Sequence, residues 1–152
     1  KEKGCIFEPF NQDGEIWYRL RLATDENVLD YIVQPQYRLG TSNGVKYPSV
    51  ADFLFRCTHA RLQGREVPAE ELEGFLPIAV YLDGYQYHAS KENLRFENDL
   101  KRRQAIGETG QYLTWTLTWD DLSKMEEGTS DALKQTWLSN NKTREILTKI
   151  PK

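Results

Sequence analysis

Three polar side chains in the middle of the sequence have the types and spacing of a metal-dependent hydrolytic site. Asp52 interrupts one apolar segment, Asp83 ends another over residues 78–82, and His88 follows Asp83 by five residues. A carboxylate within an apolar strand costs stability unless it reaches solvent, a hydrogen-bond partner or a metal. Two such carboxylates from neighbouring strands suit Mg²⁺ or Mn²⁺, with His88 as a general base or as a group that stabilises the leaving group.

Further residues are candidates for binding the metal or a nucleic acid. The backbone carbonyl of Leu82 is a candidate third ligand, because it directly precedes the second acid. Gln36 lies near the expected mouth of the site and is a candidate contact to nucleic acid. A run of three cationic residues in a predicted helix, which we call the basic triplet, is expected to contact phosphates. It consists of Lys101, Arg102 and Arg103.

Each of these features also has a purely structural interpretation. Asp52 can be a bulge or edge residue whose carboxylate pairs with a backbone amide. Asp83 precedes a glycine and can be the first residue of a turn. The basic triplet can be a solvated helix face in which Asp99 pairs with one of its arginines. Gln36 can belong to an ordinary edge strand.

Hydrophobic patterning predicts the elements that must position these residues. A Gly-rich turn over residues 40–44 separates two strand-like segments, which indicates a hairpin. Pro35 cannot donate to a ladder and indicates an edge position or a bulge. A crossover helix between the last two strands makes them parallel. The expected elements are strands over 30–39, 47–57, 78–82 and 111–118, with a helix over 91–107.

This order predicts an α/β fold: a mixed sheet made of a strand hairpin, a third strand, a crossover helix and a parallel fourth strand, flanked by helices. Residues 1–14 are expected to be irregular, and residues 16–22 suit a short strand or a short helix. Residues 59–74 predict a polar surface loop with a turn of helix at 69–72. His59 is expected to be an ordinary loop residue.

The C-terminal part is expected to be helical. Thr118 has the type and position of an N-cap, with acids in the first turn that follows. Residues 131–138 form an amphipathic pattern, and residues 140–150 are weakly helical.

Composition narrows the class of protein. The chain has 152 residues, a formal net charge of -3 and a pI near 5.5, so nucleic-acid binding requires a local basic patch. Cys5 and Cys57 form no disulfide or zinc pattern, and no apolar segment reaches the length of a membrane span. We therefore expect a cytoplasmic protein with no membrane association. The chain begins at Lys1 rather than Met, which indicates a piece of a longer protein.

Several motifs together resemble one nuclease family. They are Ala51-Asp52-Phe53, then Asp83-Gly84 with His88, then Asp99, Arg102, Ile106 and Gly110 on the following helix, and finally the run from Tyr112 to Leu122. In order and spacing they resemble the PD-(D/E)XK nuclease superfamily, in its very-short-patch-repair endonuclease-like branch. They are similar in detail to C-terminal domains of large bacterial DEAD/DEAH-box helicases, some of which act in phage defence.

The resemblance implies a restriction-endonuclease-like fold and a Mg²⁺-dependent endonuclease that hydrolyses DNA. Its partners would be DNA and a helicase domain of the same parent chain or complex. Two departures stand out: Tyr85 occupies the usual lysine position, and no helix carrying a glutamate precedes residue 30, where Glu8 and Glu15 remain unassigned. The alternative is an inactive nuclease fold that binds nucleic acid or docks a protein. The implied division is an irregular segment over 1–29, the nuclease-like core over 30–122 and a helical extension over 123–152.

Overall fold

The computed structural model describes residues 4–83, 93–118 and 121–122, without the side chains of Asp83 and of residues 93–97. Its elements, in chain order, are β1 Gly4–Gln12, β2 Glu15–Ala23, β3 Val28–Leu39, the 3₁₀ helix η1 Thr41–Asn43, β4 Ser49–Leu62, β5 Arg65–Glu66, α1 Ala69–Leu72, β6 Ile78–Asp83, α3 Asn93–Glu108 and β7 Leu113–Thr118.

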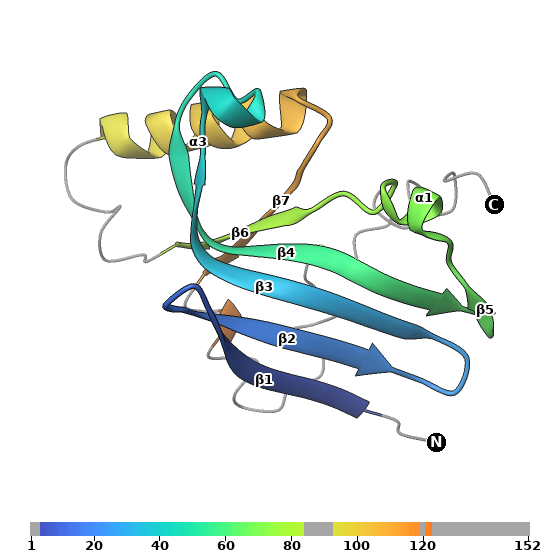
Figure 1. Ribbon diagram of the computed structural model, residues 1–152. Helices are drawn as coiled ribbons and strands as arrows, with labels where there is room; N and C mark the ends of the chain where they lie inside the picture. Colours follow the sequence, from blue (N-terminus) through green and yellow to red (C-terminus); the bar gives the residue numbers. More distant parts are fainter. Residues whose placement is uncertain (1–3, 84–92, 119–120, 123–152) are drawn as a thin grey trace.

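The strands form one mixed sheet in the order β1-β2-β3-β4-β6-β7, with β5 paired to the end of β4 (Figure 1). Among the described strands only β6 and β7 pair in parallel, and α3 lies between them in the chain. The α/β class, the mixed sheet, the hairpin of β3 and β4, and the parallel crossover are therefore confirmed. Neither helix of the described region, α1 or α3, combines the length and the apolar character that a membrane crossing needs.

The N-terminal segment differs from the prediction. Residues 4–23, expected to be irregular over their first part, form an antiparallel hairpin of β1 and β2. Its turn contains Asp13 and Gly14, whose φ angles of 52° and 90° are both positive, as a type I′ turn requires. Pro9 lies in β1, the outermost strand, where proline is tolerated.

The polar segment after residue 57 also differs from the prediction in part. Instead of a loop beginning at His59, β4 continues to Leu62 and turns back into β5. The predicted turn of helix at 69–72 is present as α1. Thr58 and His59 hydrogen-bond to Asp30 of β3, and His59 also to Glu66 of β5, so these polar residues have partners within the sheet.

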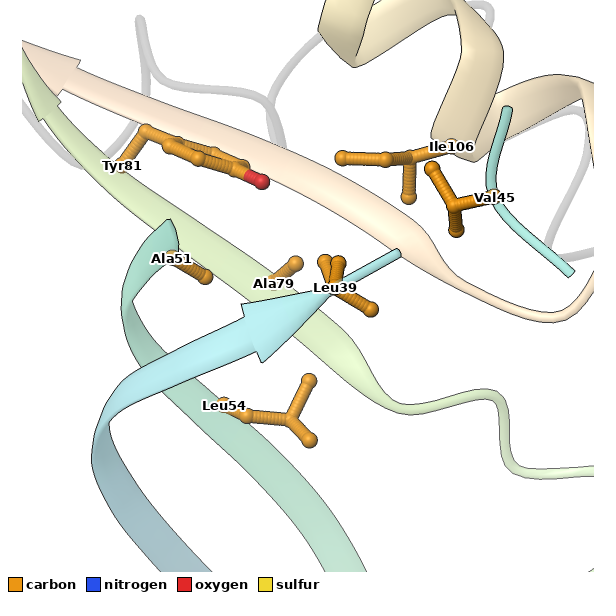
Figure 2. Packing of buried hydrophobic residues seen from close by; sticks show 7 residues of the cluster. All are labelled: Leu39, Val45, Ala51, Leu54, Ala79, Tyr81 and Ile106. Atoms are coloured by element: carbon orange, nitrogen blue, oxygen red, sulfur yellow. The ribbon is translucent and has the colours of Figure 1, made fainter. Parts of the chain in front are cut away.

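The main core lies between α3, the tip of the β3–β4 hairpin and the strands β4 and β6 (Figure 2). Removing these side chains from water holds the helix and the hairpin tip against the sheet. The cluster contains Leu39, Val45, Ala51, Leu54, Ala79, Tyr81 and Ile106, each of them buried. Tyr37 and Tyr112 pack against it.

The central hairpin bends sharply in its middle and rises toward α3 (Figure 1). The β3–β4 register includes Pro35↔Phe53 and Tyr37↔Ala51, and between these pairs Gln36 has a φ of 50°. Left-handed backbone is uncommon for a residue with a side chain and interrupts the regular strand. Pairing between β2 and β3 ends before this point, at residues 18 and 33. The predicted irregularity at Pro35 therefore coincides with the bend.

Candidate functional site

Asp52 lies at the bend, where the ladder between β4 and β6 ends. The last backbone pair of that ladder is Phe53↔Val80. Beyond it the Asp52 carboxylate takes the place of a backbone carbonyl, because its Oδ2 accepts the Leu82 amide hydrogen at 2.7 Å. The expectation that the strands bearing the two acids are neighbours is thus met. The bond also matches the structural interpretation of Asp52, an acid paired with a backbone amide.

Only part of the predicted metal set falls within the described residues. Leu82 lies in β6 beside Asp52. Asp83 is the last residue of the same strand and pairs with Thr118 of β7. Its side chain, like the whole of His88, lies outside the described residues. The predicted metal and proton-transfer roles of these two residues stay predictions.

Gln36 contacts the candidate acid directly. Its Nε2 donates to Oδ1 of Asp52 at 3.4 Å, a long and weak hydrogen bond. The two donors, Gln36 and the Leu82 amide, therefore approach different oxygens of one carboxylate. Gln36 was predicted to touch nucleic acid, and the structure adds a contact to Asp52.

Tyr81 connects the site to the core and to α3. Its hydroxyl shares a 2.8 Å hydrogen bond with Ser49 Oγ, and the Arg103 guanidinium lies 5.1 Å from the centre of its ring. Burial raises the pKa of the Tyr81 phenol; the Ser49 hydrogen bond and the Arg103 charge oppose this, whereas the Asp52 charge adds to it. Tyr81 is therefore held by Ser49 on one side and covered by Arg103 of α3.

The three residues of the basic triplet have different surroundings. Arg103 is half-buried against Tyr81. Arg102 is exposed and pairs with Asp99 at 3.6 Å, the i,i+3 pair that the structural interpretation predicts. Lys101 is also exposed on α3. The predicted phosphate contact is untested for all three residues.

Two candidate metal ligands at the bend lie within the described residues: the Asp52 carboxylate and the Leu82 carbonyl, both hard oxygen ligands. A carboxylate offers about four lone-pair sites, and the described donors to Asp52 number two. Carboxylate and backbone carbonyl oxygens are the ligands that Mg²⁺ and Mn²⁺ prefer. Within the part of the chain that the structure describes, no three His, Cys, Asp or Glu side chains gather to hold a metal.

His59 belongs to a polar cluster that the sequence analysis missed. Its Nδ1 lies 3.1 Å from Asp30 Oδ2, and its Nε2 lies 2.7 Å from Glu66 Oε2. Arg21 forms two hydrogen bonds to the same aspartate, of 2.7 and 2.8 Å. The cluster joins β2, β3, β4 and β5 side by side. No local motif marks it, because its members come from four separate strands.

Comparison with known proteins gives no family for this chain. A scan against protein-family models, a search of curated proteins and a search of solved structures each found no match.

Proposed function

We propose that this chain is a divalent-metal-dependent nuclease domain that hydrolyses phosphodiester bonds in DNA. The observation that carries the proposal is the position of Asp52 next to the end of β6. Its carboxylate binds the amide of Leu82, and the second acid, Asp83, is the next residue along that strand. The two acidic residues thus lie on adjacent strands, Asp52 on β4 and Asp83 at the end of β6.

The strand order supports the finer, restriction-endonuclease-like assignment. Strands β3, β4 and β6 follow one another antiparallel, α3 crosses over, and β7 returns parallel to β6. This is the arrangement that the resemblance implies, with the acids on its second and third strands. The fold alone implies no activity, so the proposal depends on the acids.

The roles of the residues follow from their chemistry. Asp52, Asp83 and the Leu82 carbonyl would hold Mg²⁺ or Mn²⁺, which when bound polarises a phosphate and lowers the pKa of a bound water. His88 would accept or donate the proton. Lys101 and Arg102 are exposed on α3 and would contact the DNA backbone. A helicase domain of the parent chain or complex would deliver the strand.

A second candidate function is a nuclease-like fold without catalytic activity that binds nucleic acid or docks a protein. The Leu82 bond favours it, since a structural role alone is enough to explain a carboxylate at position 52. The region that precedes β3 is also a strand hairpin, whereas the related nucleases usually carry a glutamate on a helix there.

Cleavage assays on the full chain distinguish the two candidates. Labelled single- and double-stranded DNA is incubated with MgCl₂ or MnCl₂ and wild type, Asp52→Asn or Asp83→Ala. The asparagine keeps an oxygen that can accept the Leu82 amide but loses the charge. We expect either substitution to lower the cleavage rate by about 100-fold or more, about 2.7 kcal/mol of transition-state stabilisation.

Glu70→Gln serves as the matched control, because Glu70 is an exposed acid on α1. It should cleave like wild type. Wild-type rates in the Asp52→Asn and Asp83→Ala variants would remove both acids from the mechanism. DNA binding by a wild-type chain that never cleaves would favour the second candidate.

A further inference from the structure

A groove opens where β2 and β3 separate, beside the candidate acid. Its volume is about 460 Å³, and its walls are Glu15 and Ile16 at the start of β2 and residues 34–38 of β3. It forms because pairing between these strands stops at residues 18 and 33 while β3 bends away. The backbone edges of both strands therefore face each other across the groove without a ladder between them.

Two of the polar side chains that line the groove can still form hydrogen bonds or ion pairs with a ligand. Within the described region, neither the Gln34 amide nor the Arg38 guanidinium makes a side-chain hydrogen bond or ion pair. Arg38 is exposed. Most other described arginines are engaged: Arg21 pairs with Asp30, Arg65 with Glu71 and Arg102 with Asp99, while Arg19, Arg56 and Arg103 lie over aromatic rings.

The β2 wall of the groove adds an exposed apolar side chain and a carboxylate. Ile16 is 52% exposed. The Glu15 carboxylate accepts a 3.2 Å hydrogen bond from Trp17 Nε1, which fixes it at this wall. Amides and a carboxylate recognise the hydrogen-bonding edges of bases, an apolar side chain packs against a base face, and arginine binds phosphate. These groups together match one nucleotide unit.

We infer that this groove binds an unpaired nucleotide of a single-stranded segment and leads that strand to Asp52. A volume of 460 Å³ falls in the range of sites for small ligands and is too small for a duplex. Only an unpaired base presents its Watson–Crick edge to side chains such as Gln34. Arg38 contacts the phosphate of the same nucleotide.

Gln36 links the groove to the candidate acid. It lines the groove and donates to Asp52 Oδ1 at 3.4 Å. A strand in the groove therefore passes next to the carboxylate. The inference rests on the proposed function for the identity of the ligand, and it adds that the substrate is single-stranded at the site.

Fluorescence anisotropy tests the groove without cleavage. A labelled 12-nucleotide DNA, single-stranded or annealed to its complement, is titrated with the full chain in EDTA. Wild type should bind the single strand at least 5-fold more tightly than the duplex. Gln34→Ala and Arg38→Gln should each weaken single-strand binding by at least 3-fold. Arg38→Gln should also reduce the slope of log K against log salt by about 0.7, the value for one lost phosphate contact.

Arg65→Gln is the matched control, because it removes the same charge from an exposed arginine on β5, away from the groove. It should bind like wild type, and thermal unfolding verifies that all variants fold. Preference for duplex, no binding of the single strand, or equal affinities of the groove variants and the control would each overturn the inference. Binding without cleavage rejects the hydrolytic proposal alone, whereas cleavage that is indifferent to the groove variants rejects the groove alone.

Discussion

At the scale of single residues, Asp52 has one observed and one proposed role, and the two should respond differently to substitution. It accepts the Leu82 amide at 2.7 Å, and it is the candidate metal ligand. The first role needs an oxygen, and the second needs a charge. A loss of activity in an alanine variant would therefore mix the two effects, which is why asparagine is the informative replacement.

Stability measurements isolate the structural role of Asp52. Asp52→Ala leaves the Leu82 amide without its acceptor and should lower the free energy of unfolding by about 1–3 kcal/mol. Asp52→Asn retains an acceptor and should cost about 1 kcal/mol or less. Urea denaturation at pH 7 measures both values. An unchanged free energy of unfolding in Asp52→Ala would show that the carboxylate does not support β6.

At the scale of elements, the strands and the helix that could be predicted are those whose sequence signals lie close together in the chain. Strands β3, β4 and β6, helix α3 and strand β7 follow from alternation, turn residues and a crossover. The Thr118 cap is confirmed: its hydroxyl accepts the Asp121 amide hydrogen at 3.1 Å, and Asp121 Oδ2 accepts from the Thr118 amide at 2.9 Å. These features depend on neighbours along the chain.

The missed elements have two origins: β1 follows a local turn signal that its strand residues obscure, and the extension of β4 depends on contacts between distant residues. Asp13-Gly14 is a strong hairpin signal, but apolar residues on both sides of β1 and a proline within it obscured the strand. The extension of β4 through His59 requires Asp30 and Glu66 as partners. The acids at 52 and 83 were visible as interruptions of apolar strands. The groove was not visible, because it arises where two strands separate.

The polar cluster around Asp30 should make the free energy of unfolding depend on pH. The Arg21 hydrogen bonds hold the pKa of the Asp30 carboxyl below its usual 3.8; burial opposes this effect, and the His59 charge adds to it. A lowered folded-state pKa gives stability that is present above pH 3.8 and lost as the pH falls through the folded value.

Arg21→Gln removes the largest cause of this shift. The difference in free energy of unfolding between wild type and this variant should be greatest near neutral pH and should shrink below pH 3.8. Urea denaturation between pH 7 and pH 2.5 follows this difference. A difference that stays constant over the range would mean that the ion pair adds nothing to the pH dependence.

At the scale of the whole molecule, burial is uneven across the sheet. The core cluster comes from the end of β3, the hairpin tip, β4, β6 and α3. No residue of β1 or β2, both described in full, is buried. The exposed apolar side chains of these two strands include Ile6, Phe7, Ile16 and Leu22, which are 40–54% exposed. The N-terminal hairpin therefore adds little to the main core.

Hydrogen exchange should report this asymmetry. Amides of β4 and β6 should exchange most slowly, because opening them disrupts the core, whereas amides of β1 should exchange at least about 10-fold faster. Exchange followed by mass spectrometry or NMR at pH 7 measures both sets, normalised to intrinsic rates. Equal protection in β1 and β6 would indicate that the sheet opens only as one unit.

The two walls of the groove belong to regions of the sheet that differ in burial. Its β2 wall belongs to the weakly anchored hairpin, and its β3 wall belongs to the strand that continues into the core. Sequence changes in β1 and β2 would therefore reshape the proposed groove while leaving Asp52 and its surroundings intact. Ligand choice and bond cleavage would then be free to diversify separately, since they would depend on parts of the chain that differ in burial.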